Sequence, residues 1–112
     1  MRTRASLATV LALTFVTVGS LGTTECAEDG FKRLIEAEAQ LRANNATGSL
    51  NTLNALRTAV TGLTPLTAAA TEAARVDQLF RERAFWLFGR GTRTGDLRRL
   101  IRQYNRPATS VF

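Results

Sequence analysis

From residue 31 onward, apolar residues recur every three to four positions, and no stretch alternates apolar and polar residues as a half-buried strand would. This spacing predicts four helices, near residues 31–44, 49–61, 71–89 and 95–105. The predicted fold class is therefore all-α. The predicted inward positions are Phe31, Leu34, Ile35 and Leu41 in the first helix, Leu50, Leu53, Leu56 and Val60 in the second, Val76, Leu79, Phe80, Ala84 and Leu87 in the third, and Leu97, Leu100, Ile101 and Tyr104 in the fourth.

The first two predicted helices are separated by a short polar link. Asn44 and Asn45 tolerate left-handed geometry and end the first helix, and Thr47 or Ser49 begins the second. Such a pair predicts an antiparallel helical hairpin that resembles a tetratricopeptide-type unit. No second copy follows, so this hairpin must pack on the two further helices to bury its faces.

The N-terminal residues 1–20 have the pattern of a secretory signal peptide. Arg2 and Arg4 precede fourteen uncharged, mostly apolar residues at 5–18, and Gly19 and Ser20 follow. That run is too short to span a bilayer, and Ser20 fits a cleavage position. The alternative is a short buried helix. We expect a signal-peptide helix over residues 1–20 and a flexible spacer over 21–30.

Cys26 is the only cysteine, so an internal disulfide is excluded. It is a weak candidate for lipidation, because Glu25 directly before it is unlike the small residue that a lipid-attachment site requires. The alternative is a free thiol in the spacer.

The sequence contains no histidine, which removes the commonest metal ligand and the commonest general base. Ser49 and Ser110, the only serines after the signal region, lack a nucleophile elbow and a nearby base. We therefore expect no enzymatic activity, no metal site and no cofactor.

The net charge of +6 comes from the last third of the chain. Between residues 75 and 106 there are nine arginines against Asp77, Glu82 and Asp96. One interpretation is a solvated helix face with internal ion pairs, on which Arg98, Arg99 and Arg102 point outward; the other is an anion-binding surface. Nucleic-acid binding is disfavoured, because the apolar residues of the last helix form a buried stripe and do not alternate with arginine on one exposed face.

Two charged residues fall on predicted apolar stripes and need partners. Glu38 lies within the stripe of the first helix and Arg83 within that of the third. Asp96 is the nearest acidic partner for Arg83, Glu38 is the second, and Arg93 competes for the same carboxylates. Glu38, Arg83, Arg93 and Asp96 are therefore predicted structural ion-pair residues.

Three aromatic residues, Phe85, Trp86 and Phe88, widen the apolar surface of the third helix. Such width indicates either a fully buried helix or an interaction surface. For Trp86 we favour a core position over stacking on a sugar ring.

The charged residues around this aromatic end form a recognisable pattern. Glu82-Arg83, Leu87, Gly91-x-Arg93 and Asp96-Leu97-x-Arg99 resemble the C-terminal signature of the SusD/RagB family, and Asn54-x-x-Arg57 extends the resemblance upstream. Trp86, Gly89 and Arg90 depart from the family pattern, which puts the local packing in question. The resemblance covers residues 31–107, with a tail at 108–112.

Members of that family are outer-membrane lipoproteins, several times longer than this chain, that bind nutrients. The resemblance implies a signal joined to the C-terminal piece of a glycan-binding protein, which is exported to the outer membrane or periplasm and works with a TonB-dependent transporter. It transfers no ligand-binding residue, because the family's ligand contacts lie mainly on loops outside the signature. The alternative is a small exported helical domain for structure or protein interaction, without a ligand of its own.

Overall fold

The computed structural model describes residues 23–111, and every regular element within that range is helical. In chain order these are α1 (Thr23–Arg42), α2 (Ala46–Thr58), α3 (Glu72–Trp86), α4 (Arg93–Tyr104) and a short 3-10 turn, η1 (Ala108–Ser110). The predicted all-α class is therefore confirmed for the described part of the chain. The predicted signal peptide at residues 1–20 lies outside it.

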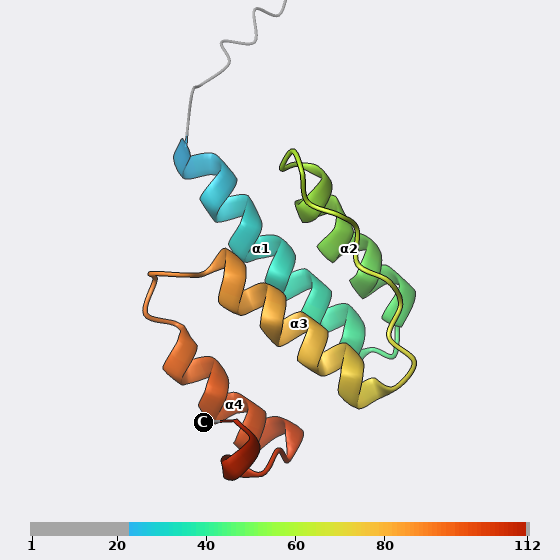
Figure 1. Cartoon of the computed structure of the whole chain (residues 1–112), viewed down its shortest axis with the longest axis vertical. Helices are drawn as coiled ribbons and strands as arrows, with labels where there is room; N and C mark the ends of the chain where they lie inside the picture. The colour runs from blue at the N-terminus through green and yellow to red at the C-terminus, as the bar shows by residue number, and fades with distance from the viewer. Residues whose placement is uncertain (1–22, 112) are drawn as a thin grey trace, which may run out of the picture.

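The helices pack around α1. Helix α2 runs antiparallel beside α1, α3 lies against another side of α1, and α4 is placed below α3 (Figure 1). The core combines aliphatic residues from all four helices with one phenylalanine. Its members are Leu34, Ala37, Leu53, Leu56, Val76, Leu79, Phe80, Leu87 and Leu100.

Side-chain caps fix the starts of α2 and α3. The Asn45 side chain accepts a hydrogen bond from the backbone N–H of Gly48 at 2.9 Å, and that of Thr71 accepts one from Ala74 at 3.1 Å. Asn44, just before the first cap, has φ of 60°. Because Asn45 provides the cap, α2 begins at Ala46, earlier than the predicted Thr47 or Ser49.

Helix α1 begins eight residues before the predicted start at residue 31. Residues 23–30, which were predicted as part of a flexible spacer, are helical. Gly30 lies inside the helix, where an added Cβ would meet no other atom within 4 Å. A single glycine costs a helix only about 1 kcal/mol, so it does not end a helix whose next turns are anchored by Leu34 and Ala37 in the core.

The corner between α3 and α4 is longer than predicted. Helix α3 ends at Trp86, three residues before the predicted end at 89, and α4 begins at Arg93, before the predicted residue 95. Gly89 and Gly91 within the corner have φ of 79° and 73°, which is left-handed backbone that other residues rarely adopt. The chain therefore turns sharply here and brings α4 back toward α1.

Three predicted inward positions are exposed. Phe31 and Ile35 on α1 are 39% and 49% exposed, and Val60 is 42% exposed. The prediction was wrong for Val60 because α2 already ends at Thr58, before the predicted residue 61. Phe31 and Ile35 line an open surface depression together with Arg83 of α3 and Arg99 of α4, so no helix buries them.

Candidate functional site

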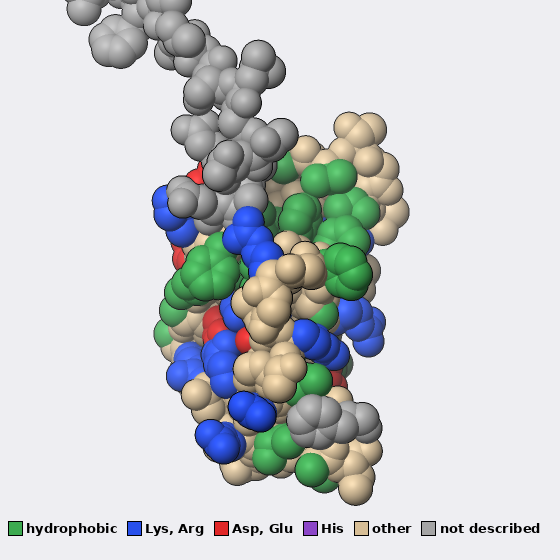
Figure 2. Space-filling view, turned by 90° about the vertical axis from the view of Figure 1, so that its left-hand side faces the viewer, with side chains coloured by type: hydrophobic (Ala, Val, Ile, Leu, Met, Phe, Trp, Pro, Cys, Tyr) green, Lys and Arg blue, Asp and Glu red, His purple; other side chains and the backbone are tan. Residues whose placement is uncertain are grey.

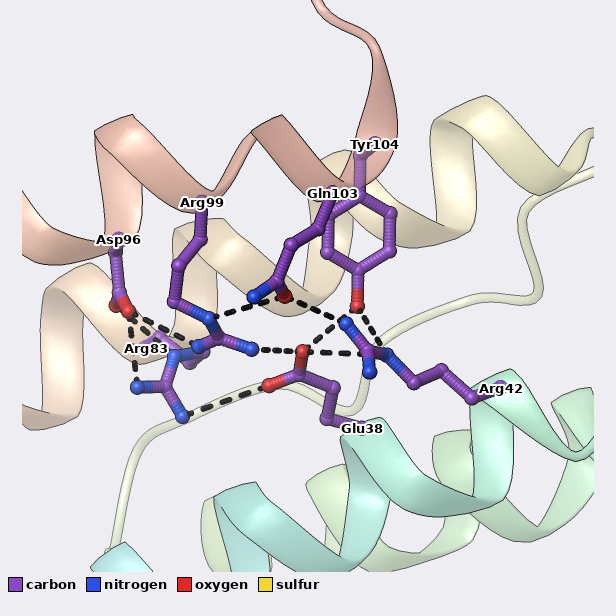
Figure 3. Close-up of polar contacts among 7 residues, drawn as sticks. All are labelled: Glu38, Arg42, Arg83, Asp96, Arg99, Gln103 and Tyr104. Carbon is purple, nitrogen blue, oxygen red and sulfur yellow. Dashed lines mark hydrogen bonds and ion pairs between the residues drawn. The ribbon is translucent and has the colours of Figure 1, made fainter. Parts of the chain in front are cut away.

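Side chains from three helices meet in a polar network between α1, α3 and α4 (Figure 3). We call this the inter-helix network; it brings together three of the four predicted ion-pair residues, Glu38, Arg83 and Asp96. Its full membership is Glu38 and Arg42 from α1, Arg83 from α3, and Asp96, Arg99, Gln103 and Tyr104 from α4.

The pair of Arg83 and Asp96 is bidentate. Arg83 Nε donates to Asp96 Oδ2 at 2.9 Å, and Arg83 Nη2 donates to Oδ1 at 3.0 Å. The two side chains are only 7% and 5% exposed, so water does not compensate either charge. This planar arrangement is the strongest hydrogen-bonded geometry available to an arginine and a carboxylate.

Glu38 is the centre of the network on α1. Its Oε1 accepts hydrogen bonds from Arg99 Nη2 and from the Tyr104 hydroxyl, the latter at 2.7 Å. Arg83 Nη1 lies 4.0 Å from the other carboxylate oxygen. One buried carboxylate thus links α1 to both α3 and α4.

The sequence prediction was wrong about Arg99, which was expected to point outward. Its guanidinium joins Glu38 and Asp96, with Nη1 donating to Asp96 Oδ1 at 3.3 Å. Arg93, the fourth predicted ion-pair residue, is exposed at the start of α4, and Asp96 is paired with Arg83 and Arg99. Arg42, Arg99 and Gln103 were not predicted as members of the network. Their spacing was a usable signal, because Arg42 lies four residues after Glu38, and Arg99 lies three residues after Asp96 and four before Gln103.

A second ion pair ties α2 to α3. Arg57 Nη1 donates to Glu82 Oε1 at 2.7 Å, and the indole N–H of Trp86 donates to the other oxygen of Glu82 at 3.1 Å. The Arg57 Nε donates to the carbonyl of Thr64 at 2.7 Å, which also holds the connector between the helices. Glu82, a residue of the family-like pattern, is 3% exposed and has no free carboxylate oxygen to offer a ligand.

Asn54, three residues before Arg57, binds the same connector. Its amide donates to the Leu66 carbonyl at 3.1 Å, and its carbonyl oxygen accepts from the Leu66 N–H at 2.7 Å. The upstream Asn-x-x-Arg pattern therefore fastens the segment between α2 and α3 to α2.

The network changes the titration of two of its members. The pKa of Tyr104 is raised above its ordinary value, first by burial and then by its hydrogen bond to Glu38, while the hydrogen bond from Arg42 opposes the rise. The pKa of Arg42 is raised mainly by its hydrogen bond to Tyr104, so it stays charged at any working pH.

The polar groups of the inter-helix network are bonded to one another. Within residues 29–111, whose side chains the structure describes, no buried side-chain nitrogen or oxygen lacks a hydrogen-bond partner, and no group of three or more potential metal ligands occurs. Within residues 23–111 no helix is long and apolar enough to cross a membrane. The arrangement holds three helices together.

The aromatic end of α3 has two different faces. Trp86 packs against the core, whereas Phe85 and Phe88 are 55% and 90% exposed. Of the two interpretations of this wide apolar surface, the exposed rings favour an interaction surface. Cys26 lies in the helical backbone of α1, and its lipidation stays a prediction.

Comparison of the chain with protein-family models, with curated proteins and with solved structures finds no match.

Proposed function

We propose that this chain is the helical C-terminal segment of a SusD-like outer-membrane protein that binds a nutrient, such as an oligosaccharide, and passes it to a TonB-dependent transporter. One observation carries the proposal. The charged residues of the family-like pattern meet in pairs across helix boundaries: Arg57 with Glu82, and Arg83 with Asp96. The partners are 25 and 13 residues apart in the sequence. Each of these charged residues is therefore accompanied by the oppositely charged residue that it pairs with in the fold.

In this proposal the segment is a scaffold. The paired arginines and carboxylates close the helices on one another, and among residues 29–111 no buried side-chain nitrogen or oxygen is left without a hydrogen-bond partner. The nutrient is then bound by residues outside the segment. The α1–α2 hairpin acts as a tetratricopeptide-type unit on which α3 and α4 are mounted.

The proposal includes export. Residues 1–20 direct secretion, and the mature protein is located at the outer membrane or in the periplasm. Cys26 is the position at which a lipid anchor would be attached.

A second candidate is a small exported domain for structure or protein interaction. It is favoured by the closure of both ion pairs within the described residues and by the exposed rings of Phe85 and Phe88. This alternative requires neither a nutrient nor a transporter.

One experiment separates the two candidates. A tag is added at the C-terminus of the chromosomal copy, the cells are fractionated, and proteins bound to the tagged product are identified by mass spectrometry. The first proposal predicts a product several times larger than 12.2 kDa in the outer-membrane fraction, bound to a TonB-dependent transporter. A product of about that mass in the periplasm without a transporter supports the second candidate, and a cytoplasmic product contradicts both.

A further inference from the structure

Two exposed phenylalanines and three arginines share one edge of the molecule. Arg81 and Phe85 are four residues apart on α3, Phe88 and Arg90 are in the corner, and Arg93 opens α4. We call these five residues the aromatic–arginine edge. Two surface depressions lie along this edge. One is lined by Phe88 and the other by Arg81, and both are lined by Ala84 and Arg93.

The charge of this edge has one sign. All three arginines are exposed, and among the side chains of residues 29–111 none of them has an ion-pair partner. Of the nearby acids, Glu82 and Asp96 are 3% and 4% exposed and are paired inward. Asp77 lines the same depression as Arg81 and is exposed, and its carboxylate is paired with Arg106 at 2.8 Å. Figure 2, which faces the corner between α3 and α4, shows hydrophobic and basic side chains side by side with fewer acidic ones.

The corner between α3 and α4 exposes the apolar side chain of Phe88. Phe88 is 90% exposed, and the left-handed Gly89 and Gly91 follow it closely in the chain. The corner lies at the outer margin of the fold, beyond the ends of α3 and α4 (Figure 1). A phenylalanine in such a position gains free energy only when something apolar surrounds it.

We propose that the aromatic–arginine edge binds the surface of an anionic lipid bilayer. Phe88 and Phe85 enter the boundary between headgroups and acyl chains, and Arg81, Arg90 and Arg93 pair with lipid phosphates. The positive charge of the edge complements an anionic headgroup layer. This binding goes beyond the nutrient-binding proposal and does not depend on it.

The shape of the edge favours a bilayer over a protein partner. An anchor residue at a protein interface fills a walled pocket on its partner, and the complementary surface here would need to be concave around Phe88. A bilayer deforms around a projecting ring without a preformed pocket. In the chain, Arg81 precedes the two phenylalanines and Arg90 and Arg93 follow them, so cations that can pair with lipid phosphates flank the rings in sequence.

The test measures binding of the full chain to vesicles of phosphatidylcholine with one quarter phosphatidylglycerol, and to vesicles of phosphatidylcholine alone. Trp86, the only tryptophan, packs edge-on against Phe85 with ring centroids 5.3 Å apart, so its emission reports whether this edge enters lipid. We expect binding to anionic vesicles with a blue shift of Trp86 emission and quenching by brominated acyl chains. Binding to the neutral vesicles should be at least tenfold weaker.

Variants locate the contact. Replacing Arg90 and Arg93 together by glutamine should weaken binding about 25-fold, since each cation near the surface contributes about fivefold. Phe88→Ser should weaken it about tenfold through lost apolar burial. The matched control replaces Arg98 and Arg102 together by glutamine. It removes the same amount of charge from the outer face of α4 and should weaken binding less than fivefold. Residues 5–18 are identical in all variants, so differences between variants report the edge alone.

Three outcomes would overturn the proposal. The first is equal binding to neutral and anionic vesicles. The second is equal loss of binding in the two double-arginine variants, which would mean a general response to net charge. The third is an unchanged Trp86 spectrum with vesicles together with tight binding of a single-stranded oligonucleotide or an acidic peptide, which would assign the edge to another partner. Circular dichroism of each variant confirms that it is folded.

Discussion

Helices α2 and α4 are attached to α1 by opposite kinds of contact. The α1–α2 hairpin is packed through small and aliphatic side chains, with Ala37 fully buried on α1 and Leu53 and Leu56 buried on α2. Helix α4 supplies one buried apolar residue, Leu100, and otherwise reaches α1 through long polar side chains such as those of Arg99 and Tyr104. The backbones of α1 and α2 therefore lie close together, whereas long side chains bridge the larger separation between α4 and α1.

The two kinds of contact have different roles: one stabilises the fold, and the other fixes the position of α4. Aliphatic packing is non-directional, so it stabilises the hairpin without selecting one precise register. A bidentate pair such as Arg83 with Asp96 forms only when the correct partner is present in the correct orientation. Its net contribution to stability is small, because the cost of removing both charges from water offsets their attraction. We infer that α1 and α2 supply most of the stability and that the inter-helix network fixes where α4 lies.

The largest expected effect comes from breaking the buried ion pair. Asp96→Ala leaves the Arg83 guanidinium without its bidentate partner at a site where that side chain is 7% exposed. We expect a loss of about 4 kcal/mol in the free energy of unfolding, measured by urea denaturation. Arg98→Ala, on the exposed face of the same helix, should cost about 0.5 kcal/mol or less.

A double-mutant cycle on Arg83 and Asp96 sharpens this result. If the pair is desolvated, removing both residues should cost much less than the sum of the two single losses. A coupling energy indistinguishable from zero would mean that both side chains face solvent in solution, contrary to the structure.

The next largest effect contrasts two leucines, one in each region. Leu53 is 2% exposed in the hairpin, whereas Leu97 on α4 is only partly buried against the core. We expect Leu53→Ala to cost about 3 kcal/mol and Leu97→Ala about half of that, because the second site leaves a smaller cavity. Hydrogen exchange should show α4 amides opening first in both variants; equal losses would argue against the division between the two regions.

The helical fold was predictable because each helix has its own local signals. Apolar residues at helical spacing locate Leu34, Leu53, Leu79 and Leu100, all of which are buried. Helix ends were predicted less well, since several residues could serve as a cap and only the packed structure selects Asn45 among them. The exposure of Ile35 could not be predicted, because periodicity gives the face of a residue but not whether another helix covers it.

The candidate site was predictable where a charge fell on an apolar stripe. Arg83 and Glu38 were identified as residues in need of partners for that reason, and the structure brings Asp96 to both Arg83 and Arg99. The role of Arg99 was missed because its long side chain reaches around α4 from a position that looks exposed. For Phe88 the sequence left a buried helix and an interaction surface open, because apolar spacing does not show that α3 already ends at Trp86 and leaves Phe88 exposed in the corner.

A smaller effect is expected at the corner that positions α4. Gly91 has φ of 73° with open space around its Cα, so Gly91→Ala is strained by its backbone conformation and not by a clash. We expect a loss of about 1.5 kcal/mol in the free energy of unfolding. The control has the opposite sign: Gly95, inside α4 and also in open space, should stabilise the protein by about 1 kcal/mol when replaced by alanine. Thermal denaturation of the two variants measures both.

The smallest effect concerns Tyr104 and appears at alkaline pH. Its hydroxyl donates to Glu38 at 2.7 Å, and its pKa in the folded protein is raised above the ordinary value, mainly by burial. The folded state therefore keeps this proton at a pH where the unfolded chain has already lost it. Its stabilising contribution is complete below a pH of about 10, the ordinary pKa of tyrosine, and is lost as the pH rises through the higher folded-state value.

Tyr104→Phe tests this directly, because Tyr104 is the only tyrosine of the chain. The variant should lose about 1 kcal/mol at pH 7, where the hydrogen bond to Glu38 is removed. Above a pH of about 10 its unfolding free energy should fall less steeply than that of the unmodified chain, so the two curves converge. Parallel curves from pH 7 to pH 12 in urea denaturation would mean that Tyr104 titrates alike in both states, and that the network does not hold its hydroxyl against α1.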